Sequence, residues 1–264
     1  MDNELIMGFY DLTKEERIKR VEEIEKAIYQ DISKGKTDAI IIYFSDVDTY
    51  IRKTGYQAMG KIYKTNINLR RTIVATLKRL LKSEEYKIRQ TAINAAGEIG
   101  MSDFETVADF FDIGLFDNHH SVRNAVIGSL KKMGQKNPDP TLKWAEQYLD
   151  YPDKEIRREI CHGIELRGRT HPQDILPMLE RLQHDKTVRV RNTLVHVLGQ
   201  IAYKKGCLEI VVKTLQNWEN QELVAKALDE IVDVHGRYRN FSALTQRQAI
   251  AYIDKNYIKK GLDL

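Results

Sequence analysis

Cysteine and proline are scarce in this sequence, and each shortage excludes a class of structure. The 264 residues include two cysteines, Cys161 and Cys207, which lie 46 positions apart within helical patterns. They are too few and too far apart for a disulfide framework or a cysteine-based zinc site, so we expect two buried thiols. Five prolines and fifteen glycines, with the glycines recurring at helix ends, favour short connections and few strands.

Long apolar runs are also missing near the start of the chain. The first 20 residues carry five acidic side chains and no extended apolar segment, which argues against a signal peptide or a transmembrane span. We therefore expect no membrane association and a cytoplasmic location. With 42% hydrophobic and 30% charged residues, the chain still has enough apolar side chains to bury a substantial core.

A repeat of 34 residues is the strongest pattern that the sequence does contain. A β-branched residue followed by arginine recurs at this spacing in Ile88-Arg89, Val122-Arg123, Ile156-Arg157 and Val190-Arg191, with an earlier copy at Ile51-Arg52. Small or apolar residues at helical spacing follow each pair and lead to a glycine, so each copy predicts one amphipathic helix. We call these the signature helices and their arginines the signature arginines. One further step reaches Val224, where Ala225 replaces the arginine, as in an atypical terminal repeat.

A second helix is predicted between consecutive signature helices. Four of these segments show the expected apolar stripes: Val107, Phe110 and Phe111; Leu142, Ala145 and Leu149; Ile175, Met178 and Leu182; and Val211, Leu215 and Trp218. Each repeat is therefore a helical hairpin. We expect both tryptophans, Trp144 and Trp218, to lie in the core because they are on second helices near these stripes.

The order of an acid, a β-branched residue, arginine, small apolar positions and glycine resembles the HEAT family over most of the chain. The resemblance implies an all-α, right-handed α-solenoid of about six HEAT-like helical-hairpin repeats, an armadillo-type fold with a long groove. Residues 1–44 lack the signature and are predicted as an N-terminal helical cap, with helices from Lys14 to Ile32 and from Ile40 to Phe44. Residues 45–264 are predicted as the repeat solenoid, one continuous domain with the cap.

An acid stands four residues before three of the signature arginines. We expect these pairs to form the ladder that couples neighbouring repeats: Asp48/Arg52, Glu85/Arg89 and Asp153/Arg157. His119 and Thr187 replace the acid before Arg123 and Arg191. We expect this replacement to leave those two arginines partly free for other partners.

Positive charge is concentrated between residues 51 and 90, although the net charge of the chain is only +4. This block holds eleven Lys and Arg against two Glu, a formal charge of +9. The predicted basic patch consists of Arg52, Lys53, Lys61, Lys64, Arg70, Arg71, Lys78 and Arg79. Such a block attracts a polyanion such as nucleic acid, whereas single cations near helix C-termini often only complement the helix dipole.

A polar column follows one face of the signature helices, because positions two and six after the β-branched residue lie four apart. Together with two signature arginines, it gives the predicted nucleic-acid or ligand contacts: Gln90, Asn94, Arg123, Asn124, Arg158, His162, Arg191, Asn192, His196 and Lys226. These side chains bond phosphates and base edges with directed groups. An ordinary solvated helix face is the alternative interpretation.

The sequence predicts no metal, no cofactor and no catalytic residue. No two of the seven histidines stand at helical spacing with a carboxylate that completes a zinc site. His162 and His196 face the same way from neighbouring repeats, but we expect their helices to be about 8 to 10 Å apart. Neither a glycine-rich phosphate loop nor a serine or cysteine nucleophile motif is present.

The C-terminal run 245–257 resembles the ending of a family of bacterial alkylpurine DNA glycosylases built from HEAT-like repeats. The resemblance implies that Arg158 corresponds to a DNA-contacting arginine, and that His196 replaces a tryptophan that packs against the damaged nucleotide. It also puts Arg123 at the catalytic aspartate, with Asp117 the nearest alternative. A cation opposes the cationic transition state of base excision, so the resemblance implies a relative that binds DNA without excising bases.

Three hypotheses for function follow. The leading one is a non-catalytic HEAT-repeat protein whose basic groove binds nucleic acid, with DNA favoured, by backbone and shape. A protein–protein interaction scaffold is the alternative, favoured by the five acids and no base within residues 103–117. The third is an alkylpurine DNA glycosylase-like base-excision enzyme. The sequence leaves open the physiological ligand, the helix layer that lines the groove and the oligomeric state.

Overall fold

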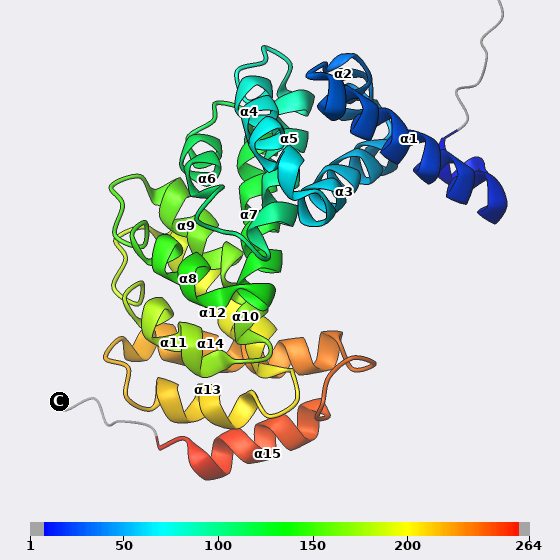
Figure 1. The fold of residues 1–264 in the computed structure, drawn as a ribbon. Coiled ribbons are helices and arrows are strands. Elements are labelled where there is room, and N and C mark those ends of the chain that lie inside the picture. Colours follow the sequence, from blue (N-terminus) through cyan, green and yellow to red (C-terminus); the bar gives the residue numbers. More distant parts are fainter. Residues whose placement is uncertain (1–7, 259–264) are drawn as a thin grey trace, which may run out of the picture. The chain divides into compact units, whose positions relative to one another are not determined.

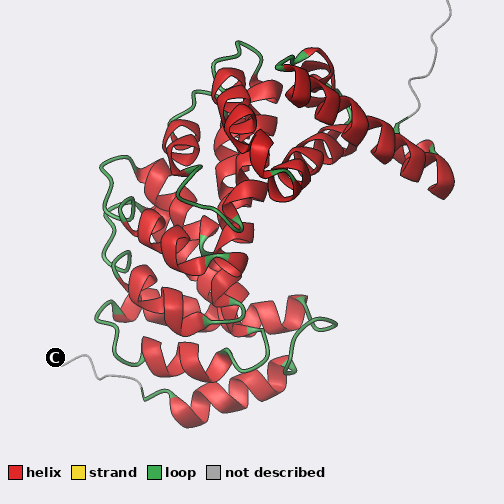
Figure 2. Cartoon of the chain, viewed as in Figure 1, coloured by secondary structure: helices red, strands yellow, loops and turns green. Residues whose placement is uncertain are grey.

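The computed structural model describes residues 8–258, and helices dominate them. Figure 1 labels the α-helices α1 to α15 in chain order, and Figure 2 shows no strand within residues 8–258. This confirms the predicted all-α class of HEAT-like helical hairpins. The sequence dictates it because apolar residues recur with the helical period and not with the period of two that strands require.

Two compact units make up the chain, and each is described by itself. Unit 1 ends at Ser129 and contains η1 (Phe9–Asp11), α1 (Lys14–Lys34), α2 (Asp38–Ser45), α3 (Thr49–Thr65), η2 (Ile67–Leu69), α4 (Arg70–Leu80), α5 (Tyr86–Gly100) and α6 (Ala108–Leu115). Helix α7 (His120–Lys136) begins in unit 1 and ends in unit 2. Unit 2 begins at Leu130 and contains α8 (Pro138–Glu146), α9 (Lys154–Gly163), α10 (Glu165–Gly168), α11 (Pro172–Glu180), α12 (Val188–Ala202), α13 (Leu208–Leu215), α14 (Gln221–Arg237) and α15 (Gln246–Asn256).

Unit 1 is built on the signature helices α3 and α5, which pack against each other. Helix α1 extends this layer by packing on α3, while α2, α4 and α6 pack on it from the second layer. The core between the layers holds fully buried Ile28, Phe44, Met59, Ile93 and Phe111. Burial of each such side chain stabilises the fold by about 1.5 to 3 kcal/mol before entropy is considered.

The two predicted N-terminal helices are present as α1 and α2. Helix α1 starts at a capping box, in which Glu16 N–H donates to Thr13 Oγ1 at 3.3 Å and Thr13 N–H donates to Glu16 Oε2 at 2.8 Å. It ends at Gly35, whose φ of 66° is in the left-handed region that favours glycine. Because α1 packs on α3 and α2 on both α3 and α5, these helices belong to the same compact unit as the first repeats. The domain boundary at residue 44 stays a prediction.

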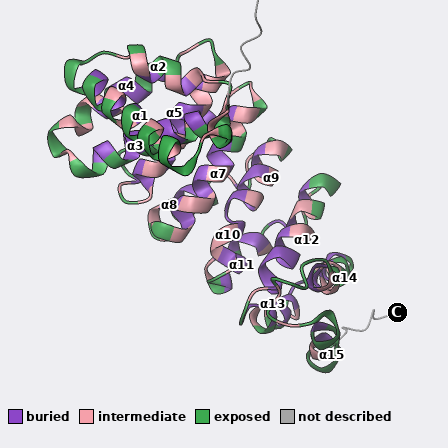
Figure 3. Cartoon of the chain, turned by 90° about the vertical axis from the view of Figure 1, so that its right-hand side faces the viewer, coloured by how far each residue is buried: buried purple, intermediate pink, exposed green. Residues whose placement is uncertain are grey.

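Unit 2 repeats the same plan. Its signature helices α9, α12 and α14 pack side by side, and α11, α13 and α15 follow one another in the second layer. Ile160, Leu194, Leu198 and Val211 are fully buried between the layers, and so is Trp218, as predicted. Figure 3 shows the buried residues along the faces where neighbouring helices meet.

One signature helix differs from the prediction. The pattern from Ile156 to Gly168 predicts a continuous helix, whereas the structure has α9 and then the short α10, with Ile164 between them. Before the break, Gly163 lies so close to Leu130 that an added Cβ would be 2.9 Å from its Cδ1. After the break, the Glu165 side chain turns inward and is only 2% exposed.

Candidate functional site

The signature arginines share one internal role, which is to close the turn before their own helix. In each repeat the Nη1 group donates to a backbone carbonyl six residues earlier: Arg52 to Asp46, Arg89 to Ser83, Arg123 to Asp117, Arg157 to Tyr151 and Arg191 to Asp185. Nη1 of Arg123 and of Arg191 therefore has a backbone partner, and replacing the acid four residues earlier does not release this group. The expectation that the two arginines are partly free for other partners stays a prediction.

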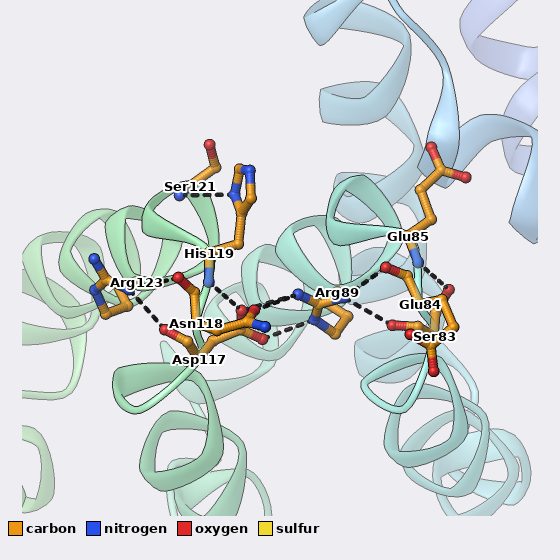
Figure 4. A network of polar contacts seen from close by, with 9 residues as sticks. All are labelled: Ser83, Glu84, Glu85, Arg89, Asp117, Asn118, His119, Ser121 and Arg123. Atoms are coloured by element: carbon orange, nitrogen blue, oxygen red, sulfur yellow. Dashed lines mark hydrogen bonds and ion pairs between the residues drawn. The ribbon is translucent and has the colours of Figure 1, made fainter.

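The ladder between repeats exists, but its acid comes from the following repeat. In unit 1, Arg89 Nε lies 2.7 Å from Asp117 Oδ2, and Nη2 lies 3.0 Å from Oδ1 (Figure 4). In unit 2, Arg157 holds Asp185 in the same way, at 2.5 and 3.1 Å. These bidentate pairs join side chains 28 positions apart, so the predicted pairing with an acid four residues earlier is wrong.

The acids four residues earlier lie at helix starts, where a short acidic side chain bonds the local backbone. Asp48 accepts from the N–H of Tyr50 at 2.7 Å and caps α3. Asp153 accepts from the N–H of Glu155 at 2.8 Å and caps α9. Aspartate is a preferred N-cap because its carboxylate satisfies an N–H that the helix leaves without a partner.

Asp117, the nearest alternative to the glycosylase aspartate, is held as a structural group. Its side chain is 10% exposed, and it accepts from Arg89 and from the backbone N–H of His119 at 2.8 Å. Burial raises the pKa of Asp117, but these hydrogen bonds outweigh it and hold the pKa below its usual range. Both oxygens of Asp117 are therefore engaged by neighbouring groups of the protein.

The predicted basic patch lies on α3 and α4, and about half of it is neutralised or packed within unit 1. Lys61 pairs with Glu25 at 2.7 Å, Lys78 lies 3.5 Å from Asp109, and Arg70 covers the ring of Tyr63. Arg52 bonds backbone carbonyls. The remaining members are exposed and have no ion pair among residues 8–258: Lys53, Lys64, Arg71 and Arg79.

The acidic stretch of residues 103–117 finds many of its partners inside unit 1. Asp103 accepts from the Tyr63 hydroxyl at 2.5 Å, Asp109 lies by Lys78, and Asp117 closes the ladder to Arg89. Much of its negative charge is therefore compensated locally. This weakens the argument that the stretch would repel phosphate and so favours a protein partner.

Four members of the polar column meet at one hollow between α9 and α12 in unit 2. The lining residues are Arg158, His162, Val188, Arg189, Asn192, Thr193 and His196, around a volume of about 480 Å³. We call this the α9–α12 hollow. Cations, imidazoles, an amide and a hydroxyl converge on it, a set of groups suited to an anion.

A smaller hollow continues along the N-terminal half of α12 toward α14. Its lining includes Arg191, Asn192 and Lys226 together with Asn220 and Glu222, around about 40 Å³. It shares Val188 and Asn192 with the α9–α12 hollow. Thus the predicted contact residues of unit 2 lie along one run of surface formed by three signature helices.

Exposed ion pairs balance the cations of this run. Glu155 lies 2.9 Å from Arg158 and 3.2 Å from Arg189, while Glu222 lies 2.6 Å from Lys226. The side chains of Arg189 and Lys226 are 66% and 60% exposed. Exposed pairs of this kind contribute only about 0 to 1 kcal/mol, so a phosphate can replace the carboxylate at little cost.

His162 and His196 lie closer together than the expected helix separation. Their rings stack with centroids 6.2 Å apart and planes within 9° of parallel. Lys131 Nζ lies 2.8 Å from His162 Nε2, a contact in which a neutral imidazole accepts from the ammonium. Burial lowers the pKa of His162, and the positive charge of Lys131 lowers it further. Glu165 lies 3.6 Å from the Nδ1 of His162, and Glu230 lies 3.5 Å from that of His196.

The predicted contacts of unit 1 are placed on two helices. Gln90 and Asn94 are half-buried on α5, and Asn124 is exposed on α7, next to the turn-closing Arg123. As contact residues they stay a prediction.

Sequence reasoning missed Arg189, Val188 and Thr193. A signal for two of them was present, because positions 189, 192, 193 and 196 follow the spacing of one helical face. The polar column contains only positions two and six after the β-branched residue, which is Val190 in this helix. Position 189, just before Val190, is therefore not part of it. Val188 is 58% exposed and gives the hollow an apolar edge.

The described part of the chain shows neither a metal-binding cluster nor a membrane-spanning helix. Within residues 8–258, no group of three or more His, Cys, Asp and Glu is arranged to hold a metal ion. Over the same residues, no helix has both the length and the apolar character that crossing a bilayer requires.

These observations define the class as a HEAT-like repeat protein, with hairpins closed by arginine and linked by Arg–Asp pairs. The fold is similar to that of AlkD2 from Streptococcus mutans, with 18% identity and a TM-score of 0.54 over 77% of this chain and 97% of that one. The crystal structure of smu.31 from Streptococcus mutans UA159 gives a TM-score of 0.52 at the same identity and coverage. No protein-family model and no curated protein sequence matches the chain.

Proposed function

We propose that this HEAT-like repeat protein binds nucleic acid, with DNA favoured, through the run of hollows along α9, α12 and α14, and that it does so without catalysis. The observation that carries the proposal is that all the contact residues predicted in unit 2 line these two adjoining hollows. Successive hollows with exposed cations, Arg189 in one and Lys226 in the other, suit successive phosphates of a backbone.

The absence of base excision is part of the proposal. Arg123 occupies the position of the catalytic aspartate in the glycosylases that the sequence resembles, and the nearby Asp117 carboxylate is bound by Arg89 and His119. A carboxylate held in this way has no free oxygen to stabilise positive charge on a sugar. The likeness to AlkD2 supports a shared fold only.

Fluorescence anisotropy with labelled single-stranded, duplex and branched DNA, at low and moderate salt, tests the binding. We expect salt-sensitive binding by the wild type and no base release from alkylated DNA in a parallel assay. Failure of all three DNAs to bind at low salt would overturn the proposal. Base release would overturn its non-catalytic part.

A double variant locates the surface. Arg189→Ala with Lys226→Ala removes two exposed cations whose ion pairs contribute little to the fold. Two lost phosphate contacts should make the slope of log K against log salt shallower by about 1 to 2. Lys143→Ala with Lys213→Ala is the matched control, since these exposed lysines lie on the second-layer helices α8 and α13. Equal effects of the two double variants would remove these hollows from the proposal.

A protein partner is the second candidate, and exposed apolar side chains in unit 1 favour it. Ile42 is 62% exposed and Val47 is 70% exposed, close in sequence to Tyr50, which contacts the exposed Tyr10 at 4.2 Å between ring centroids. A photo-crosslinking residue at position 47 tests this surface against one at Ile113, which is 54% exposed on α6. A discrete protein crosslink from position 47 alone would support the candidate, and equal crosslinking from both positions would reject it.

A further inference from the structure

A separate hollow lies at the C-terminal end of unit 2. It is formed by the turn between α12 and α13 and by the loop between α14 and α15, and it encloses about 540 Å³. The loop is tied to the turn, because Ala243 N–H donates to the carbonyl of Tyr203 at 3.0 Å. None of its lining residues belongs to the two hollows along α9, α12 and α14.

Apolar side chains form most of the wall of this C-terminal hollow. Ala202, Leu208, Phe241, Ala243 and Leu244 line it. Phe241 is 73% exposed although it is a large aromatic residue, so water covers a ring that an apolar ligand would cover more favourably. The volume falls in the range of about 300 to 1,000 Å³ that is usual for small-molecule sites.

One buried imidazole gives the hollow a polar anchor. His235 is only 1% exposed, yet it lines the hollow. Its Nδ1 lies 2.7 Å from the carbonyl oxygen of Ile231, so Nδ1 carries the hydrogen and donates it. The Nε2 atom of the neutral ring is then an acceptor, and it has no hydrogen-bond partner among residues 8–258. An acceptor without a protein partner at the wall of a hollow can receive an N–H or O–H group of a ligand.

Two cations stand at the rim. Lys204 lies over the ring of Tyr203, with Nζ 4.4 Å from the centroid, and Lys205 is exposed with no ion pair among the described residues. Glu209 is the one acid that lines the hollow, so the rim carries a net positive charge. The rim therefore favours an anionic group on the ligand.

We propose that the C-terminal hollow of unit 2 binds a small aromatic anion that also carries an N–H or O–H donor. The aromatic body lies against Phe241 and Leu244, the donor bonds Nε2 of His235, and the anionic group faces Lys205. This site goes beyond nucleic-acid binding and does not depend on it.

Anilinonaphthalene sulfonate is a suitable probe, because it combines an aromatic body, a sulfonate and a secondary amine N–H. We expect a saturable rise in its fluorescence with the native protein. Lys205→Ala should weaken its binding by roughly fivefold, the effect of one exposed charge. The same variant should leave binding of the uncharged phenylnaphthylamine unchanged. Lys213→Ala, which removes an equal charge from the exposed side of α13, is the control and should bind both probes normally.

Two wall variants complete the test. Phe241→Ala removes an exposed ring without opening the core, and it should weaken both probes at least threefold, since both lose the same aromatic contact. His235→Phe removes the acceptor, and a thermal melt shows whether this buried variant still folds. Fluorescence that does not saturate, or binding unaffected by both Lys205→Ala and Phe241→Ala, would overturn the proposal even if His235→Phe is unstable.

Discussion

At the scale of single residues, the signature arginine acts in two directions at once. Its Nη1 group closes the turn before its own helix, and in two repeats Nε and Nη2 hold an aspartate of the following repeat. That aspartate is the residue whose backbone carbonyl receives the next signature arginine, as at Asp117 and Asp185. The ladder thus links one turn to the next, and removing a single carboxylate leaves a nearly buried guanidinium without its partner.

Asp185→Asn tests the stabilising role of the ladder. The Asp185 side chain is 4% exposed and that of Arg157 is 14% exposed, so solvent compensates poorly for the lost charge. We expect the free energy of unfolding to fall by roughly 3 kcal/mol, as for other buried ion pairs broken on one side. Urea unfolding at neutral pH measures it. Asp254→Asn, at an exposed position on α15, is the control and should change stability by less than about 0.5 kcal/mol. Equal losses in both variants would show that the ladder does not stabilise the fold.

Acid should erase the difference between the wild type and Asp185→Asn. Burial raises the pKa of Asp185, but hydrogen bonds from Arg157 and the Thr187 N–H outweigh it, so the folded pKa is below the unfolded value of about 3.9. A lowered carboxyl pKa stabilises the fold above the unfolded pKa, and this contribution is lost as pH falls through the folded pKa. The stability gap should therefore be constant above about pH 5 and shrink below pH 4. A gap that stays constant down to pH 3 would contradict the assignment.

At the scale of helices, the repeat glycines Gly168 and Gly199 allow close packing between neighbouring elements. A Cβ on Gly168 would lie 2.5 Å from Ile175 Cδ1 and 2.7 Å from Ile201 Cδ1, both in unit 2. Gly128, in contrast, has no atom within 4 Å of such a Cβ, although it lies inside α7. The two positions separate the packing role of glycine from its poor helix propensity.

Gly168→Ala and Gly128→Ala should shift stability in opposite directions. The first forces a methyl group into packed isoleucines and should destabilise the protein by about 1 to 3 kcal/mol. The second removes backbone entropy from a helix interior without a clash and should stabilise it by about 0.5 to 1 kcal/mol. Thermal or urea unfolding of both variants gives the comparison. A stabilised Gly168→Ala would mean that the neighbouring helices move apart at little cost.

At the scale of the whole molecule, the net charge is a poor guide to ligand binding, because ion pairs inside each unit already neutralise many of the cations. The 42 Lys and Arg nearly balance the 38 Asp and Glu. Many of the concentrated cations of residues 51–90 already have acidic, aromatic or backbone partners. The cations available to a ligand are the exposed ones that have no strong partner within the protein. The folded structure decides which cations these are, because it brings acids and carbonyls next to the others.

Nucleic-acid binding, if it uses the α9–α12 hollow, should strengthen as pH falls. Protonation of His162, whose ring stacks on that of His196, adds positive charge to the hollow beside Arg158. Because burial and the charge of Lys131 lower the pKa of His162, the gain in affinity from protonation of His162 should appear mainly toward pH 5.5. We expect affinity to rise by about threefold to tenfold between pH 7.5 and pH 5.5, measured by anisotropy at constant salt.

A histidine pair outside the hollow supplies the control for this pH dependence. His162→Gln with His196→Gln should flatten the pH profile. His171→Gln with His184→Gln, both at exposed positions away from the hollow, should retain it. The same slope in both double variants would assign the effect to other groups.

The all-α class, the hairpin repeat and the face shared by Arg158, His162, Asn192 and His196 follow from the sequence pattern alone. They follow from it because helical periodicity fixes which side chains share a face, and a repeat copies that face into register. The same helical spacing places Arg189, three residues before Asn192, on this face, although the polar column defined from the β-branched residue does not include it.

The interaction partners of these residues, in contrast, depend on tertiary packing. The ladder acid of Arg89 is Asp117 and not Glu85. Glu85 lies at the N-cap of α5, whereas the stacking of the next repeat brings Asp117 within hydrogen-bond distance of Arg89. Likewise, the break before α10 turns the Glu165 side chain inward. The loop between α14 and α15 packs over the α12–α13 turn and encloses His235. These choices depend on contacts between residues about 30 positions apart, where local spacing has no influence and packing selects the partner.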